Sequence, residues 1–296
     1  MDGILIIDKP AGITSHDVVS RVRRVLKTKR VGHTGTLDPF ATGVMVILVG
    51  KATRLAQYLN KDEKEYKAVV QFGFETDTGD ATGSPKSKVQ SPKSVAIDEL
   101  RFVLPQFSGE TKQTPPMYSA KKVEGKKLYE LARKGVEIER KTITVNIHEL
   151  DLLHDSVGSP QSSFGIRVVC SAGTYIRTLA EDIGRAIGVG AHLIELRRTQ
   201  AGKFLIDEAV SLDKLSESDN PGRYLRPVRE AVDQLPVFEL RDDRVEKTKN
   251  GMSTRDLSGR FADRETVQMV RADGELMAIG FFNATEKVVQ PKVVLG

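Results

Sequence analysis

Hydrophobic residues recur along the chain with two periodicities, one typical of strands and one typical of helices, which together predict a mixed α+β protein. Residues 3–7 and 164–170 are short apolar or alternating segments that end at turn residues, which is typical of strands. Residues 44–49 form a continuous apolar run of branched side chains, the pattern of a buried strand. Residues 64–74 and 143–153 read as further strands.

Helical spacing follows several of these strands. Thr14 and Ser15 supply an N-cap, and Asp17 lies in the first turn, where a carboxylate is favourable. The apolar face of this helix consists of Val18, Val19, Val22, Val25 and Leu26. Further helices are expected over residues 50–59, 97–102 and 174–184.

Residues 76–94 are polar and rich in Gly, Ser, Thr, Pro and Lys, so they predict a loop. Asp77 and Asp80 resemble a calcium loop only superficially, because the later glycine and the closing glutamate are missing.

The pattern of apolar and turn-forming residues changes at about residue 235. Short apolar segments alternate with turn signals at Asn250-Gly251, Ser258-Gly259 and Asp273-Gly274, the pattern of a small β-barrel. We therefore expect one domain over residues 1–234 and a second over residues 235–296.

Length and composition fit a soluble globular protein. The 296 residues suffice for one large domain with a small one. The formal net charge of +5 suggests a polyanionic partner, although a mildly basic soluble protein would look the same.

The chain has one cysteine, Cys170, which follows Val168 and Val169 at the end of an apolar segment. One cysteine excludes an intrachain disulfide framework and favours a reducing cytosol, and Cys170 reads as a small core residue. The first ten residues lack the basic region and cleavage site of a signal peptide, and no apolar stretch is long enough to span a bilayer. The sequence thus predicts a cytoplasmic protein.

Two segments concentrate positive charge. Six cations at positions 21, 23, 24, 27, 29 and 30 form either a solvated helix face or a phosphate-attracting surface. Residues 114–135 interleave lysines with tyrosines, a mixture suited to RNA, although Leu128, Leu131 and Ala132 equally fit an ordinary surface helix.

The most unusual stretch is residues 32–43, where three glycines bracket Asp38 directly before the apolar run at 44–49. Pro39 disfavours helical geometry at Asp38, and the glycines allow positive φ or a close backbone approach. Two interpretations remain open: an Asp that accepts N–H groups of its own loop, or a carboxylate presented for chemistry on a rigid loop.

Residues 32–43 closely resemble the catalytic motif of the bacterial tRNA pseudouridine-55 synthases, the TruB family. Five more motifs of that family stand in its order, namely Lys9-Pro10-x-Gly12-x-Thr14-Ser15, Gly50-Lys51-Ala52-Thr53-Arg54, Pro115-Pro116-x-Tyr118-Ser119-Ala120-Lys121, Gly173-Thr174-Tyr175-Ile176-Arg177 and Leu196-Arg197-Arg198. The resemblance covers most of residues 1–205.

This resemblance implies the pseudouridine synthase fold: a bifurcated, mainly antiparallel sheet with flanking helices and a central cleft, followed by a small PUA-like RNA-binding β-barrel. It implies that uracil is detached from its ribose at position 55 in the T loop of tRNA, rotated, and rejoined through C5. No metal or organic cofactor, membrane or obligatory protein partner is implied, and we expect a monomer.

The resemblance also implies residue roles. Asp38 matches the family nucleophile, which attacks ribose C1′ or uracil C6 or promotes loss of a ribose proton. Arg177 would pair with Asp38 and keep it ionised. Tyr66 would stack on the displaced uracil and help to remove the C5 proton, while Tyr175 and Leu196 would line the pocket.

The remaining implied contacts are to RNA. His33 would fill the space left by the flipped base, and Arg54 would lie beside the substrate phosphate. Tyr118 and Lys121 belong to a mobile thumb over residues 114–140 that closes on the T loop. Flipping a base costs a few kcal/mol, which such contacts must offset.

Two other functions fit the same residues. One is a non-catalytic RNA-binding or RNA-folding protein, against which the combination of Asp38, Tyr66 and Arg177 argues. The other is the eukaryotic and archaeal relative that modifies other RNAs with partner proteins, against which the bacterial-like length argues.

Overall fold

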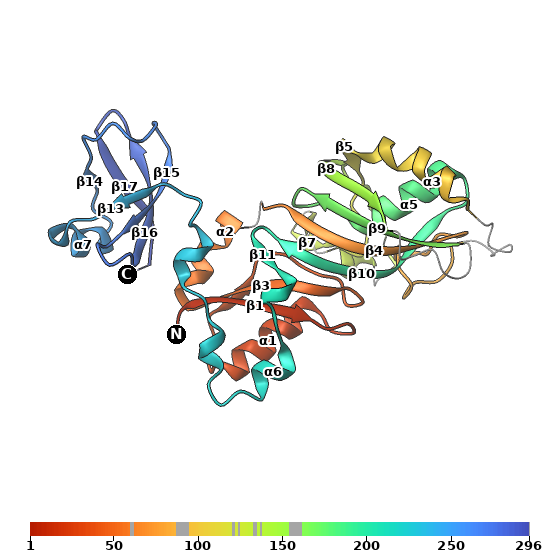
Figure 1. Cartoon of the computed structure of the whole chain (residues 1–296), viewed down its shortest axis with the longest axis horizontal. Helices are drawn as coiled ribbons and strands as arrows, with labels where there is room; N and C mark the ends of the chain where they lie inside the picture. Colours follow the sequence, from red (N-terminus) through yellow and green to blue (C-terminus); the bar gives the residue numbers. More distant parts are fainter. Residues whose placement is uncertain are drawn as a thin grey trace.

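The computed structural model describes residues 1–59, 62–86, 95–119, 122–123, 125–132, 135–136, 138–153 and 162–295. The predicted contact residue Lys121 lies outside this part of the chain. The structure has the expected α+β composition, with a large sheet, flanking helices and a second sheet at one end (Figure 1).

The large sheet is mainly antiparallel and runs in the order β12-β1-β3-β10-β4-β9-β8-β5, with β2 paired to β3 and β11 paired to β10. Its strands are β1 (Gly3–Lys9), β2 (Val31–His33), β3 (Thr42–Val49), β4 (Lys64–Phe72), β5 (Gly109–Gln113), β8 (Ile143–Leu152), β9 (Ser163–Cys170), β10 (Ala191–Ala201), β11 (Phe204–Leu205) and β12 (Val210–Ser211). Only the β1–β12 and β3–β10 pairs are parallel.

Helices pack against this sheet in two groups (Figure 1), and both groups contribute to one hydrophobic core. Near β1 and β3 lie α1 (Ser15–Val25) and α6 (Leu212–Ser216), and near β10 lie α3 (Ile97–Val103) and α5 (Ile176–Ile187). The α1 helix begins as predicted, because Thr14 and Asp17 form a reciprocal capping box. Its apolar face packs into the same core as β1, β3, β4 and α5.

The apolar run at 44–49 is indeed a strand buried on both faces. Met45, Ile47 and Val49 of β3 face the helices, whereas Val44, Val46 and Leu48 belong to a second core on the opposite face. Because successive side chains of a strand point to opposite faces, one short strand joins two cores.

Three predicted boundaries shift. His33 lies at the end of β2, paired with Ile47, rather than within the loop. The helix expected over residues 50–59 is split into a 3-10 turn, η1 (Gly50–Leu55), and α2 (Ala56–Leu59), and the Thr53 hydroxyl donates back to the Gly50 carbonyl in the tight turn. The β4 strand ends at Phe72, since Gly73 takes a φ of 116° that turns the chain.

Short elements connect the large sheet to the C-terminal region. They are η5 (Pro221–Tyr224) and η6 (Val228–Ala231), whereas η2 (Leu104–Phe107) lies between α3 and β5 and η4 (Ile206–Glu208) lies between β11 and β12.

The C-terminal region is a curled five-stranded sheet in the order β13-β15-β16-β17-β14. It comprises β13 (Val237–Glu239), α7 (Asp242–Lys249), β14 (Thr254–Arg255), β15 (Thr266–Val270), β16 (Leu276–Asn283) and β17 (Val288–Val294). Side chains of Val270, Leu276 and Ile279 join the second core beneath β1 and β3. The two sheets therefore share apolar packing.

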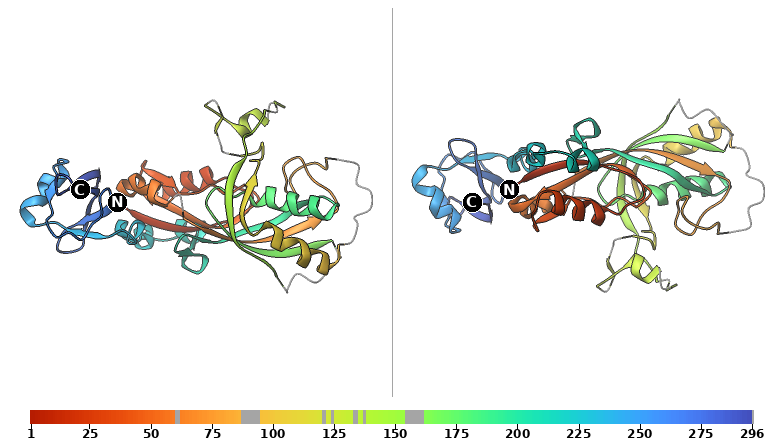
Figure 2. Two further views of the ribbon diagram at one scale, coloured as in Figure 1. Left: turned by 90° about the horizontal axis from the view of Figure 1, so that it is seen from above. Right: turned by 90° about the horizontal axis from the view of Figure 1, so that it is seen from below.

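A small segment projects from the side of the large sheet (Figure 2). It contains the two-stranded pair β6 (Lys122–Val123) and β7 (Lys126–Lys127), followed by α4 (Leu128–Ala132). This segment lies within residues 114–140, for which the family resemblance implies a thumb.

A fully buried lysine lies at the end of β1. The Lys9 ammonium donates to the carbonyl oxygens of Pro10 at 2.9 Å, Pro39 at 3.2 Å and Ala41 at 2.6 Å, so it holds the loop that carries Asp38. Burial lowers the pKa of Lys9 to about 8, against an opposing effect of Asp38.

Replacing Lys9 by Met should destabilise the fold by about 2 kcal/mol or more at pH 7, because three carbonyls lose their donor. Between pH 8 and 10.5 the unfolded chain holds the Lys9 proton more tightly than the folded chain, so this group adds stability as pH rises. The difference in free energy of unfolding between the unsubstituted chain and Lys9→Met should therefore increase by about 2–3 kcal/mol across that range. Urea unfolding at several pH values measures it, with the exposed Lys51→Met as control. A difference that stays constant with pH contradicts the account.

Candidate active site

A cleft of about 250 Å³ opens between the two groups of helices. Its lining comes from the loop after β2, the strands β4 and β10, the start of α5 and the thumb segment. Its lining includes Asp38, Tyr66, Ser119, Tyr175, Arg177 and Leu196.

The loop that carries Asp38 is fixed at several points. The Ser15 hydroxyl accepts from the Leu37 N–H at 2.8 Å and donates to the Leu37 carbonyl at 2.9 Å. At the far end, a Cβ on Gly43 would lie 2.1 Å from the Arg198 carbonyl oxygen, and Gly43 has a φ of 104°. Only glycine lets β3 approach β10 so closely, as the glycine pattern predicted.

Asp38 is held by Arg177 on both oxygens. Oδ2 lies 2.9 Å from Nε, and Oδ1 accepts from Nη2 at 3.1 Å. The carboxylate therefore faces Arg177 rather than capping its own loop. The Asp38 side chain is 30% exposed, whereas Arg177 is only 5% exposed.

The charge state of Asp38 reflects two opposing effects. Burial raises the pKa of the Asp38 carboxyl above its ordinary value, and Asp80 adds to the rise. The Arg177 guanidinium acts in the opposite direction, through its charge and its hydrogen bond. The ion pair thus limits a shift that burial alone would make larger.

Arg177 lies in the first turn of α5, as predicted, where a cation opposes the helix dipole. Its position is stabilised by three other chain segments. Besides Asp38, its donors reach the Thr78 carbonyl at 2.7 Å and the Tyr118 carbonyl at 2.7 Å. The Asp80 carboxylate lies 3.8 Å from Nη1.

Asp80 also organises the described part of the polar loop, residues 76–86. Its buried carboxylate accepts from the Thr78 hydroxyl at 2.9 Å and the Thr82 N–H at 2.9 Å, which turns the Thr78 carbonyl toward Arg177. The loop expected here is present. Its polar side chains are hydrogen-bonded within the loop and hold it in a compact conformation.

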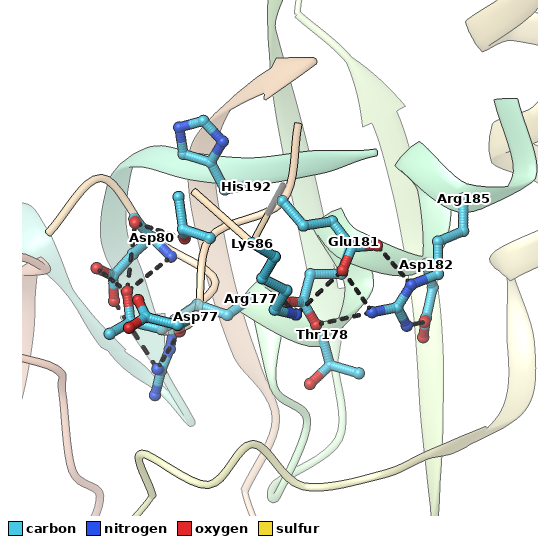
Figure 3. Close-up of polar contacts among 12 residues, drawn as sticks. Asp77, Asp80, Lys86, Arg177, Thr178, Glu181, Asp182, Arg185 and His192 are labelled. Carbon is cyan, nitrogen blue, oxygen red and sulfur yellow. Dashed lines mark hydrogen bonds and ion pairs between the residues drawn. The ribbon is translucent and has the colours of Figure 1, made fainter. Parts of the chain in front are cut away.

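Ion pairs fasten the two ends of this loop to α5 (Figure 3). Lys86 lies 3.0 Å from both Glu75 and Glu181, and Arg185 lies 2.6 Å from Glu75. Both ends of the loop are therefore attached to α5, the helix that carries Arg177.

Two side chains from neighbouring strands form the inner wall of the cleft. Tyr66 of β4 and Leu196 of β10 are buried. Burial raises the pKa of the Tyr66 hydroxyl, an effect that the nearby Arg198 opposes. The Arg198 guanidinium is itself buried and donates to the carbonyls of Val44 at 2.7 Å and Gly35 at 3.1 Å.

Tyr175 closes the cleft from the start of α5, where it is the N-cap residue. Burial raises the pKa of its hydroxyl. The structure thus brings Asp38, Tyr66, Tyr175, Arg177 and Leu196 together around one cleft.

The other predicted contact residues are His33, Arg54, Tyr118 and Lys121. His33 is outside the cleft lining, and burial lowers the pKa of its imidazole. Arg54 is exposed and donates to the Val294 carbonyl of the C-terminal sheet. Tyr118 contributes its backbone carbonyl to Arg177, and Lys121 is outside the described residues.

The sequence alone assigned no role to Lys9, Asp80, Gln113 or Arg198, although Asp80 was noted in a superficial likeness to a calcium loop. Lys9 and Arg198 belong to motifs that match the family, so the sequence marked both positions, but it assigned neither residue a function. Asp80 lies in a loop whose composition predicts only polarity.

The arrangement suits a reaction that develops positive charge on a substrate. It offers a carboxylate in a narrow cleft, a fixed guanidinium behind it, and aromatic and aliphatic walls that fit a planar ring. Within the described residues, no group of three or more His, Cys, Asp or Glu side chains could hold a metal ion. No helix there is both long and apolar enough to cross a membrane.

Comparison with known proteins agrees with this geometry. Residues 23–176 match the N-terminal domain of TruB family pseudouridylate synthases, and residues 177–235 match the C-terminal domain of tRNA pseudouridylate synthase B. The tRNA pseudouridine synthase B of Bacillus pumilus is 40% identical over 304 residues, which covers 100% of this chain and 98% of that protein. The protein of the same name from Aromatoleum aromaticum is 48% identical over 81% of this chain and 77% of its own length.

Solved structures show the same architecture. The crystal structure of a Cbf5-Nop10-Gar1 complex aligns with a TM-score of 0.73 at 27% identity, over 99% of this chain and 85% of that chain. The archaeal box H/ACA sRNP Nop10-Cbf5 complex gives a TM-score of 0.71 at 26% identity, over 99% of this chain and 86% of that chain.

The expected fold is confirmed: a pseudouridine synthase sheet with a C-terminal curled sheet consistent with a PUA-like domain. From the matching family models, the near full-length relatives and the shared fold, the chain belongs to the TruB family of pseudouridylate synthases and is an isomerase.

Proposed function

We propose that this enzyme converts uridine to pseudouridine at position 55 in the T loop of tRNA, with Asp38 as the essential residue. The observation that carries the proposal is the bidentate pair of Asp38 and Arg177 at a cleft lined by Tyr66, Tyr175 and Leu196. Pure RNA binding has no need of a carboxylate that faces the RNA, because carboxylates repel phosphates.

The size of the cleft supports base flipping. At about 250 Å³ it is smaller than the roughly 300–1,000 Å³ of pockets for drug-sized ligands, so it suits one base rather than a base pair. A uracil in the cleft would therefore have left its stack, and stacking on Tyr66 would offset part of the few kcal/mol that this requires.

The reaction conserves all atoms. The bond between N1 and ribose C1′ breaks, a bond between C5 and C1′ forms, the C5 proton leaves, and N1 gains a proton. Positive character on the sugar is stabilised or trapped by ionised Asp38, as a carboxylate does in retaining glycosidases. Attack at C1′, attack at C6 and loss of a ribose proton all require this ionised form.

Tyr66 stacks on the displaced base and takes part in removing the C5 proton. Because burial raises the pKa of its hydroxyl, the phenol is protonated at neutral pH and passes a proton only as part of a relay. No electrons are transferred, so the proposed chemistry needs no redox cofactor.

The basic face of α1 is proposed to bind tRNA phosphates. Arg21 and Arg24 are exposed on this helix and Lys27 is exposed just after its C-terminal end, whereas Arg23 donates to the Val31 carbonyl at 3.0 Å and serves the fold. The thumb, with Tyr118 and Lys121, closes over the T loop, and His33 and Arg54 contact the RNA.

The enzyme is proposed to act as a cytoplasmic monomer on tRNA alone, without an obligatory protein partner. The division of labour is proposed to fall at about residue 235, with residues 1–234 catalytic and residues 235–296 as a PUA-like RNA-binding domain.

A tRNA transcript with tritium at uridine C5 tests the reaction directly, because forming pseudouridine releases that hydrogen. The unsubstituted chain should release one tritium for each T loop, and Asp38→Asn should slow release by more than about a hundredfold. Undiminished release by Asp38→Asn would remove the aspartate from the proposal, and binding without release by the unsubstituted chain would indicate a non-catalytic protein.

The pH dependence of the rate tests the ion pair. Activity should fall as pH drops through the pKa of Asp38, because protonation removes the charge. In Arg177→Met the pKa of Asp38 should rise further, because the opposing guanidinium is lost, which moves the acidic limb to higher pH. Arg185→Met, on the same helix but in surface ion pairs, is the matched control and should leave the limb in place. An unmoved limb in Arg177→Met would show that Asp38 does not govern it.

Salt dependence tests the phosphate contacts. The logarithm of tRNA affinity should fall linearly with the logarithm of salt concentration, and each phosphate contact removed by Arg21→Gln, Arg24→Gln or Lys27→Gln should reduce the slope by about 0.7–0.9. Filter binding at several salt concentrations measures this, with Arg101→Gln on α3 as control. The pair Lys126→Gln and Lys127→Gln tests the thumb in the same way, and an unchanged slope would exclude it from the interface.

A further inference from the structure

Gln113 is a buried polar residue at the point where the chain leaves the large sheet for the thumb. It is the last residue of β5, pairs with Ile143 of β8 and is only 2% exposed. A buried amide must be hydrogen-bonded on both of its ends, so the partners of Gln113 reveal what it holds.

Those partners are the two backbone groups of one cleft residue. The Tyr175 N–H donates to Gln113 Oε1 at 2.9 Å, and Gln113 Nε2 donates to the Tyr175 carbonyl at 3.3 Å. The side-chain amide therefore pairs with Tyr175 as a neighbouring strand would. This fixes the position of the Tyr175 backbone relative to β5.

Tyr175 needs such support because it begins a helix without a side-chain cap. It is the N-cap residue of α5, its own side chain caps nothing, and its carbonyl already accepts from the Leu179 N–H at 3.0 Å. The first N–H groups of a helix have no partner within the helix. Gln113 supplies the partner for one of the N–H groups at this end.

The same chain segment holds the next functional residue. Six residues after Gln113 the segment reaches Ser119 in the cleft lining, and the carbonyl of Tyr118 accepts from Arg177 at 2.7 Å. The Thr114 carbonyl lies 3.5 Å from the Thr178 hydroxyl. Residues 113–119, the root of the thumb, are thus hydrogen-bonded to Tyr175 and to Thr178, the two ends of the 175–178 stretch.

We propose that Gln113 is a positioning residue for catalysis, which sets the Tyr175 ring and the first turn of α5 against the root of the thumb. Its amide acts through Tyr175 and does not touch substrate. The inference rests on the proposed function only for the tRNA substrate used in its test.

Two substitutions separate positioning from mere packing. Gln113→Met keeps the length and buried area but has neither donor nor acceptor. Gln113→Glu keeps the acceptor for the Tyr175 N–H, and when ionised it faces the Tyr175 carbonyl without a donor. When protonated, the acid again offers one donor and one acceptor, like the amide.

The experiment measures single-turnover pseudouridine formation in a tRNA transcript at saturating protein, together with the tRNA dissociation constant and the melting temperature. Gln113→Met should lower the rate by about ten- to a hundredfold, since small displacements of cleft groups have effects of that size. Its dissociation constant should stay within about twofold, because the phosphate contacts that dominate tRNA affinity are elsewhere.

For Gln113→Glu the readout is the ratio of its rate to that of the unsubstituted chain at the same pH. The ratio cancels the common dependence on Asp38. It should rise as pH falls from 8 to 5, as protonation restores the donor toward the Tyr175 carbonyl. Far-ultraviolet circular dichroism confirms at each pH that both proteins are folded.

Gln71→Met is the matched control. Gln71 is also a glutamine of the large sheet whose amide donates to backbone carbonyls, of Phe72 and Ser162 at 3.1 Å, but it lies outside the cleft lining. Its loss should leave the single-turnover rate unchanged.

Equal rates for Gln113→Met and the unsubstituted chain would overturn the inference, as would a Gln113→Glu ratio that does not vary with pH. Equal slowing by Gln113→Met and Gln71→Met would assign the effect to general packing. If the unsubstituted chain itself forms no pseudouridine, the proposed substrate is wrong and the inference falls with it, which is a result distinct from the other two.

Discussion

The structure depends above all on one buried cation. Arg177 is almost completely enclosed, and such a charge is tolerated only when it is paired and fully hydrogen-bonded. Its donors are shared between the loop of Asp38, the loop of Asp80 and the root of the thumb. Removing any one of these partners would leave part of a buried charge uncompensated. The cleft is therefore stable only when all three segments are in place.

This sharing explains why the cleft forms where it does. The helices α1 and α6 pack against one part of the large sheet, and α3 and α5 pack against another part. Polar segments meet between them, and they are joined by Arg177 and by the buried ammonium of Lys9. Apolar packing builds the two walls, and buried ionic contacts determine how the loops sit between them.

Local pattern predicted the elements well because strand and helix periodicities are local properties. The run at 44–49, the N-cap at Thr14 with Asp17 in the first turn, and the first-turn position of Arg177 were all visible in sequence. Asp38 stood out by its glycines and its proline. The roles of Tyr66 and Tyr175 came from family resemblance, since periodicity alone would have placed Tyr66 in the core.

The parts that sequence could not predict are contacts over long separations. The hydrogen-bond partners of Arg177 at Tyr118, Thr78 and Asp38 lie 59, 99 and 139 residues away, and Gln113 reaches Tyr175 across 62 residues. Nothing in a polar loop distinguishes the buried Asp80 from an exposed Asp. The split of the 50–59 helix and the place of His33 in β2 were likewise set by neighbours.

The two-sided burial of β3 has a consequence for how this enzyme can change. Inserting or deleting one residue between Asp38 and Gly43 would either move the glycine away from Arg198 or shift β3 by one position. Such a shift would exchange the side chains that face two differently shaped cores. The strand that follows the loop thus constrains its length. Variants of this enzyme that accept a different base, natural or engineered, are therefore expected to differ by side-chain substitutions in this loop rather than by insertions or deletions.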